Sequence, residues 1–246
     1  MDNAEKMLDA IMRFNRKERY HLIRHAVTGG PMSLSDGFRR EVGEVLDLSV
    51  PDNAYVAMDY HLDWLSAAYH IASKGGTIET AMNRKDENGY ENYPNDKSDP
   101  VLAGNILDTD LLIAYRCDGR VVVILVEAKA DSDWSLSQIS DKAARLKSIF
   151  DEGRDSSKLI KPYFLLLGPS KKSSSTLSKE QADGKRFPSW FFVKNAGNQR
   201  VIPHLTMTPD MPLYAPTRVP NTEGRYSKWK VSKRNRFHPN KTSDEQ

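Results

Sequence analysis

The chain has 246 residues, of which 39% are hydrophobic and 28% are charged, and its formal net charge is +3. This length and composition suit one large globular domain with appended segments, and no apolar run reaches the roughly 18 residues that a membrane helix requires. The single cysteine, Cys117, excludes an intrachain disulfide and a cysteine zinc cluster. The first residues lack the basic and apolar regions of a signal peptide, so we expect a cytoplasmic protein.

The first 32 residues are expected to form a helical segment of their own. Apolar residues recur at helical spacing from residue 3 to residue 26. The polar patch that starts at Asn15 is either the solvent-facing side of one long helix or a short break in it. Gly29 and Gly30, which precede a proline, end the segment.

A second helix is expected to follow, capped by Ser33 or Ser35 and running through residues 38–46. Glu41 and Glu44 lie three residues apart and therefore share one face of this helix. Two such glutamates usually lie on the solvent-exposed face of a helix and have no further role. A helix glutamate that faces a metal cluster is the alternative.

Residues 55–72 are rich in apolar and aromatic side chains and are predicted to form a third helix. Asp59 and Asp63 would then lie one turn apart on the same face, whereas His61 would lie off that face. A structural role is therefore preferred over a metal site for these three residues.

A long polar loop is expected at residues 74–100. Residues 78–82 are apolar enough for a short strand, and the rest has no periodicity. Long loops inside compact domains are usually functional or disordered. This loop directly precedes the candidate site described next, which favours contact with a substrate.

Two apolar runs rich in β-branched residues form the centre of the chain. The turn signal Asp118-Gly119 lies between them and predicts an antiparallel hairpin. The first run begins with acids that include Asp110, and the second ends with Glu127 and Lys129. Residues two apart on a strand project from the same face, so the carboxylate of Glu127 and the ammonium of Lys129 point the same way. With Asp110 they predict a site for a divalent metal ion and a hydrolytic water at one end of a sheet.

A helix is expected to follow the second run, capped by Ser132 or Asp133. Its apolar positions have the spacing of a helix that lies against a sheet. Gln138, Lys142 and Arg145 recur at the same spacing and form a polar edge beside the buried face. Lys142 and Arg145 are interpreted either as contacts for a phosphate or as solvated side chains.

The strand predicted at residues 161–168 is buried by composition, and a strand after a helix indicates a βαβ crossover. Further strands are expected at residues 190–194 and 200–206. From residue 209 onward, recurring prolines favour an extended wrap over more core.

Basic charge is concentrated at the C-terminal end of the chain. Residues 225–246 contain seven Lys or Arg and two Asp or Glu, a net charge of +5, which leaves −2 for the rest. Cations interleaved with aromatic side chains suit a phosphate backbone with stacked bases, and a solvated terminus is the alternative. The candidate nucleic-acid contacts are Lys228, Trp229, Lys230 and Arg234.

The order of helix, strand hairpin, helix and strand, with an acid on one strand and Glu-x-Lys on the next, resembles the PD-(D/E)XK nuclease superfamily. The resemblance covers residues 33–168. It implies an α/β protein with a restriction-endonuclease-like core at residues 33–208, in which helices flank a mixed central sheet. An N-terminal helical region at residues 1–32 and an extended basic tail at residues 209–246 would complete the chain.

The resemblance also implies catalytic roles for individual residues. The acid of the superfamily maps to Asp110, with Asp108 as its rival two residues away, and the (D/E)xK motif maps to Glu127 and Lys129. The glutamine that the superfamily often has in the next helix maps to Gln138. The chain lacks the Pro-Asp dipeptide that often supplies the first acid.

A magnesium ion is the cofactor that the resemblance implies, with Mn²⁺ as an alternative. Mg²⁺ prefers hard oxygen ligands and keeps several waters, so Asp110, Glu127 and the Ala128 carbonyl would suffice to hold it. The upstream helix glutamate of the superfamily, which would complete the cluster, maps to Glu41 or to Glu44.

These features predict a Mg²⁺-dependent endonuclease that hydrolyses phosphodiester bonds of DNA, in a defence, repair or mobile-element context. Lys129 would orient or deprotonate the attacking water and stabilise the developing charge. One alternative is a nucleic-acid-binding module with the same fold and no reaction, and another is a protein-interaction subunit. The sequence does not decide whether the substrate is DNA or RNA, or whether it is single- or double-stranded. It also does not decide whether the chain acts as a homodimer or with a partner subunit.

Overall fold

A computed structural model describes residues 1–85, 93, 95–98, 100–104, 107–130, 134, 136–150, 156–168, 187–207, 214–220 and 226–233. Its elements in chain order are α1 (Asn3–Phe14), α2 (Glu18–Ile23), the π-helical turn η1 (Arg24–Thr28), α3 (Asp36–Leu46), β1 (Tyr55–His61), α4 (Leu62–Ser73), α5 (Ile78–Met82), β2 (Asp108–Cys117), β3 (Arg120–Ala128), α6 (Leu136–Phe150), α7 (Ser156–Leu159), β4 (Ile160–Gly168), the 3₁₀ turn η2 (Ser189–Phe191), β5 (Val193–Lys194), β6 (Arg200–Val201), β7 (His204–Thr206), β8 (Tyr214–Pro220) and β9 (Tyr226–Lys233). Within these ranges no helix is both long and apolar enough to cross a membrane.

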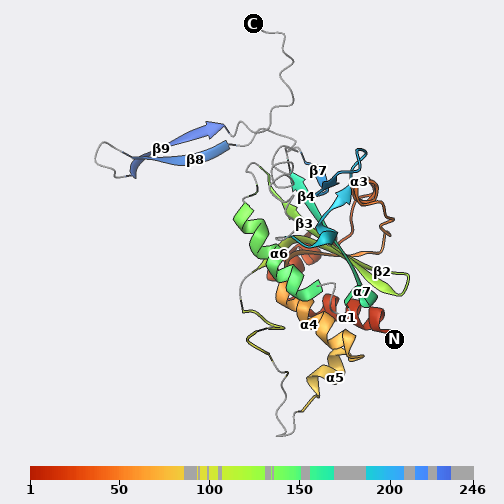
Figure 1. Ribbon diagram of the computed structural model, residues 1–246. Coiled ribbons are helices and arrows are strands. Elements are labelled where there is room, and N and C mark those ends of the chain that lie inside the picture. The colour runs from red at the N-terminus through yellow and green to blue at the C-terminus, as the bar shows by residue number, and fades with distance from the viewer. Residues whose placement is uncertain are drawn as a thin grey trace.

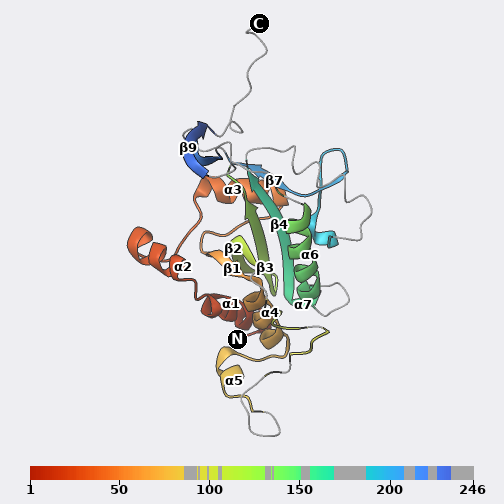
Figure 2. The same ribbon diagram turned by 90° about the vertical axis from the view of Figure 1, so that its left-hand side faces the viewer.

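A five-stranded mixed sheet in the order β1-β2-β3-β4-β7 forms the centre of the molecule (Figure 1). The strands β1, β2 and β3 pair antiparallel, and β4 and β7 continue the sheet in parallel with β3. The helix α6 connects β3 to β4 and lies beside β4 (Figure 2). The predicted α/β class, the mixed sheet flanked by helices and the βαβ crossover are thus confirmed.

The strand β3 is buried on both faces. Val121, Val123 and Leu125 pack in the larger core with residues of α1, α4 and α6. The alternate residues of β3 pack in a second core with Val42 and Leu46 of α3. Burial on both faces explains why the sequence of β3 is a continuous apolar run and not an alternating pattern.

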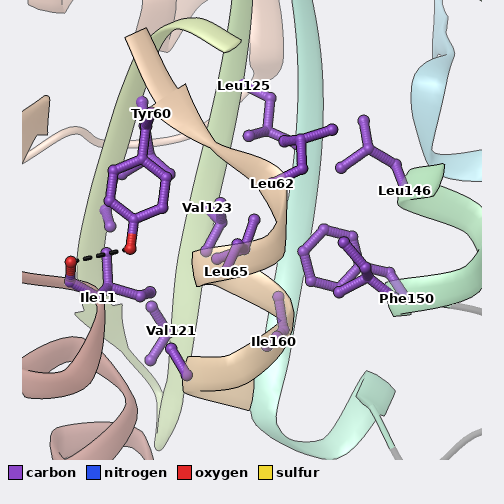
Figure 3. Packing of buried hydrophobic residues seen from close by; sticks show 14 of the residues in the cluster. Ile11, Tyr60, Leu62, Leu65, Val121, Val123, Leu125, Leu146, Phe150 and Ile160 are labelled. Carbon is purple, nitrogen blue, oxygen red and sulfur yellow. Dashed lines mark hydrogen bonds between the residues drawn. The ribbon is translucent and has the colours of Figure 1, made fainter. Parts of the chain in front are cut away.

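The N-terminal helix α1 contributes to the larger core. Ile11 is fully buried, and its carbonyl accepts a hydrogen bond of 2.9 Å from the buried hydroxyl of Tyr60 (Figure 3). In the same view Leu65 of α4 and Phe150 of α6 approach the apolar side chains of β3. The expected boundary at residue 32 therefore does not separate two cores.

The N-terminal helical run is broken at Asn15, as the second interpretation of its polar patch allowed. The amide of Asn15 donates to the Tyr55 hydroxyl at 2.9 Å, and its oxygen accepts the backbone N–H of Lys17 at 3.2 Å. This buried side chain thus satisfies backbone and side-chain partners at the break. The helix α3 follows as predicted, with the Ser35 hydroxyl accepting the backbone N–H of Phe38.

The helix predicted for residues 55–72 is wrong in its first part, which forms β1 and pairs with β2. A dense apolar run does not separate a strand from a helix by its period alone. The helix α4 begins only after β1, where Nδ1 of His61 accepts the backbone N–H of Asp63 at 3.1 Å. Asp59 and Asp63 therefore lie on different elements and not on one helical turn.

The shorter predictions have mixed outcomes. Residues 78–82 form the helix α5, which begins with a capping box between Thr77 and Thr80, and not a strand. Residues 190–194 form the end of η2 and the two-residue strand β5. The described part of the tail is extended, as expected, and forms the antiparallel pair β8–β9 outside the central sheet.

The hairpin predicted at Asp118-Gly119 is confirmed. The strands β2 and β3 pair from Leu111–Val126 to Cys117–Arg120. Asp118 and Gly119 both have a positive φ, of 50° and 73°, as the preferred two-residue hairpin turns require. Cys117 is exposed beside this turn.

Arg145 ties α6 to α4 and to the segment that precedes β2. Its guanidinium donates to the Asp63 carboxylate from Nε at 3.1 Å and from Nη2 at 2.6 Å. It also donates to the carbonyls of Pro100 and Val101, at 3.0 and 2.6 Å. The residue is only 7% exposed, so the prediction that it contacts a phosphate is replaced by a structural role.

We expect Arg145→Leu to lower the free energy of unfolding by about 3 kcal/mol or more, because it leaves the Asp63 carboxylate buried without its partner. Urea unfolding followed by circular dichroism measures this change. Lys147→Leu, at an exposed position of the same helix, is the matched control and should change stability little. The double variant Arg145→Leu/Asp63→Leu should recover part of the loss, and a loss larger than that of the single variant would contradict this interpretation.

Candidate metal and active site

Asp110 and Glu127 face each other where the β2–β3 pair ends. Leu111 pairs with Val126, so the next positions outward on the two strands are Asp110 and Glu127. There the Asp110 carboxylate accepts the backbone N–H of Ala128 at 2.7 Å. A side chain thus continues the ladder where the backbone pairing stops. This contact places one carboxylate directly beside the strand segment that carries the other.

The carboxylate of Glu127 is buried and forms an ion pair with Lys142 of α6. Glu127 is 4% exposed, and the Lys142 side chain is 17% exposed. Burial raises the pKa of Glu127 to about 7; the charge of Lys142 opposes this shift, the charge of Asp110 adds to it, and that of Lys129 opposes it. Lys142 was predicted as a phosphate contact on the flank of its helix, but it lies inside the candidate site as the counter-ion of Glu127.

Lys129 supplies a second cation next to the carboxylates. Its backbone N–H donates to the Leu167 carbonyl of β4 at 2.9 Å, which fixes the chain just beyond β3. The side chain is half-buried and near enough to lower the pKa of Glu127. In the described part of the chain its ammonium has no hydrogen bond or ion pair, so it is available to a ligand.

Gly168 and Trp134 support the backbone that carries Lys129, and the sequence interpretation missed both. A Cβ at Gly168 would lie 2.7 Å from Cη2 of the Trp134 ring and 3.0 Å from the Lys129 carbonyl oxygen. Only glycine therefore fits without moving the buried ring or the Lys129 backbone. The sequence signal that could have revealed this support is the glycine at the end of a buried strand, because such a glycine can mark a place where another group packs closely against the backbone.

Asp108, the rival of Asp110, is engaged elsewhere. Its carboxylate pairs with Nζ of Lys17 at 2.6 Å, and Lys17 lies between α1 and α2. Asp110 instead contacts Ala128. The geometry therefore favours Asp110 as the acid of the candidate site.

Asp59 is a third acid close to this level of the sheet. The pairs Met58–Leu111 and Tyr60–Thr109 place it opposite Asp110 in the β1–β2 register. It has a positive φ of 50° and pairs with Arg19. Across the described ranges, no three His, Cys, Asp or Glu side chains are grouped so that they could hold a metal ion. The carboxylates that the fold brings together are thus the pair Asp110 and Glu127.

The structure does not bring the predicted helix glutamates to this pair. Glu41 and Glu44 are both exposed on α3. That helix packs on one face of the sheet through Val42, whereas Glu127 contacts α6 on the other face. Gln138 fits better, because it is exposed one turn before Lys142 and therefore on the same side of α6.

The predicted nucleic-acid contacts of the tail lie on β9. Lys228, Trp229 and Lys230 are all exposed there. Arg234 lies outside the described residues.

The two carboxylates at the strand ends are the residues that could hold a magnesium ion. Mg²⁺ is usually held by one or two carboxylates and keeps several waters, so Asp110, Glu127 and the Ala128 carbonyl are a sufficient set. The carboxylate of Glu127 already binds a cation, the Lys142 ammonium. A metal ion at this position would therefore share the Glu127 carboxylate with Lys142 or displace that lysine.

Comparison of the chain with family models, with curated proteins and with solved structures found no match. A function for the chain therefore rests on the geometry and charges of its own residues.

The raised pKa of Glu127 predicts a pH-dependent stability. Between the ordinary value of 4.5 and about 7, the folded protein binds a proton at Glu127 that the unfolded chain has released. The free energy of unfolding should therefore fall as the pH rises through this window, by about 3 kcal/mol from this group. Glu127→Gln cannot ionise and should lack this loss. Urea unfolding in EDTA at several pH values between 4.5 and 8 measures the difference between the two proteins.

The exposed Glu44→Gln variant is the control, and its stability should follow that of the wild type at every pH. Parallel pH profiles for the wild type and Glu127→Gln would contradict the assignment of a buried, raised-pKa carboxyl to Glu127.

Proposed function

We propose that the chain is a Mg²⁺-dependent nuclease of the PD-(D/E)XK type that hydrolyses phosphodiester bonds of DNA. The observation that carries the proposal is the contact of the Asp110 carboxylate with Ala128. It joins the acid of one strand to the Glu127-Ala128-Lys129 segment of the next.

The order of the elements also supports the restriction-endonuclease-like interpretation. The helix α3 precedes three antiparallel strands, β1, β2 and β3, and α6 then leads to the parallel strand β4. The two strands that carry the acids are adjacent in the sheet. Their ends lie at the same edge because the hairpin is antiparallel.

The chemistry of these groups suits phosphodiester hydrolysis. A divalent ion held by Asp110 and Glu127 would lower the pKa of a bound water and polarise a phosphoryl oxygen. Lys129, whose ammonium has no partner among the described residues, would orient that water and stabilise the charge that develops on the phosphate. Gln138, on the exposed side of α6, would contact the water or the lysine.

We expect Lys129→Ala and Asp110→Asn each to lower the rate of DNA cleavage by about 100-fold or more, the scale of a lost general acid–base or charge-stabilising group. Asn at position 110 can still accept the Ala128 N–H, so this variant should keep the hairpin end intact. Cleavage of a plasmid and of a single-stranded DNA with Mg²⁺, Mn²⁺ or EDTA measures the effect. The exposed Lys147→Ala variant of α6 is the control, and full activity in either site variant would overturn the proposal.

A nucleic-acid-binding module without the reaction is the second candidate. The observation that favours it is the ion pair of Glu127 with Lys142, which satisfies the buried carboxylate without a metal ion. Retention of nucleic acid with no metal-titration signal at Glu127 and no cleavage of either substrate would support this candidate over the nuclease.

A further inference from the structure

The strands β8 and β9 form a two-stranded ribbon that projects from the body of the molecule (Figure 1). The name β8–β9 ribbon is used below for Tyr214–Pro220 and Tyr226–Lys233. In its register Arg218 lies opposite Trp229, and Thr217 lies opposite Lys230. Because side chains alternate along a strand, Trp229 and Arg218 share one face of the ribbon. Lys228 and Lys230 share the other face.

The ribbon is strongly basic for its size. Its two strands contain one arginine and three lysines and no Asp or Glu, a net charge of +4. Arg218, Lys228 and Lys230 are all exposed. A concentration of cations without acids attracts a polyanion and does not stabilise the ribbon itself.

Trp229 is the second unusual feature of the ribbon. It is 68% exposed, although tryptophan is highly buried on average. Within the described ranges its ring makes no stacking or cation–π contact. Arg218 lies directly across the strand pair, at the spacing where cross-strand side chains interact, and is poised to cover one side of a ring stacked on Trp229.

We propose that the β8–β9 ribbon binds single-stranded nucleic acid, with a base stacked on Trp229 and phosphates on Lys228 and Lys230. A single strand exposes the faces of its bases to an aromatic side chain, whereas a duplex hides them inside its stack. A flexible strand can also follow β9 and reach both faces of a narrow ribbon. A flat anionic membrane would meet only one face, and the lysines and the tryptophan lie on opposite faces.

This inference rests on the proposed function, because it names the form of the substrate that the ribbon would bring to the nuclease site. The test uses the full chain carrying Lys129→Ala, in EDTA, so that no cleavage occurs during the binding measurement. Fluorescence anisotropy of a labelled 20-nucleotide oligothymidylate and of a 20-base-pair duplex gives the two dissociation constants.

In this background Trp229→Ala should weaken binding of the oligothymidylate about 5- to 150-fold, the range measured for loss of one stacked base. Trp229→Phe keeps an aromatic ring and should retain most of the affinity. Lys228→Gln/Lys230→Gln should make the slope of log K against log salt shallower by about 1.4, because each lost phosphate contact on a single strand removes about 0.7. The control Lys74→Gln/Lys147→Gln removes two exposed lysines outside the ribbon and should leave the slope unchanged.

Three results would overturn the inference: unchanged affinity in the Trp229 and lysine variants, tighter binding of the duplex than of the oligothymidylate, or binding to phosphatidylserine vesicles with no binding of the oligothymidylate. The nuclease proposal is tested separately, by measuring DNA cleavage by the wild type and its loss in Lys129→Ala. Cleavage by the wild type, together with unchanged binding by the ribbon variants, would overturn only the ribbon proposal. Weaker binding by the ribbon variants, with no cleavage by the wild type, would overturn only the nuclease proposal.

Discussion

Burial of a carboxylate at the end of β3 is the constraint on which the candidate site depends. The strand lies between two cores, and its apolar residues alternate between them up to Val126. The next side chain that faces α6 is Glu127, which is buried with 4% of its surface exposed. Desolvation disfavours the charged form, so the pKa rises even though two ammonium groups lie nearby. Lys142 compensates part of this penalty, and this is why α6, and not only the sheet, defines the site.

The second acid is positioned by a backbone contact and not by a cation. Asp110 accepts the N–H of Ala128 at the point where β2 and β3 stop pairing, so its carboxylate is held by the strand that carries Glu127. The pair of carboxylates is thereby matched by two ammonium groups, those of Lys129 and Lys142. Lys142 is bound to Glu127, whereas Lys129 has no partner among the described residues. The two lysines therefore differ in what they are free to do, although the sequence shows both simply as cations near the strand end.

Much of the fold could be predicted because its signals are local. The positive-φ turn at Asp118-Gly119, the cap at Ser35 and the crossover through α6 each depend on a few neighbouring residues. The strand β1 was missed because a dense apolar run has no distinguishing period and its pairing partner, β2, lies about fifty residues further along. Within the site, helical spacing placed Lys142 and Arg145 on one edge of α6. It did not reveal that their partners are Glu127 and Asp63, since the rotation of α6 against the sheet is a property of the packed core. The prediction that Glu41 would join the carboxylate pair does not hold for the same reason, because helix periodicity does not say which face of the sheet a helix covers.

The far end of the β2–β3 hairpin has a practical consequence for experiments on this protein. Cys117 is the single cysteine of the chain and is exposed beside the turn. Cys117 lies seven positions along the extended strand from Asp110, about 24 Å at the usual rise per residue. A thiol-reactive fluorophore would therefore attach at one defined place, away from the carboxylates and on a rigid strand. Partial desolvation and the Asp118 carboxylate raise the pKa of this thiol, so labelling should be slower than at an unperturbed cysteine and should speed up as the pH is raised.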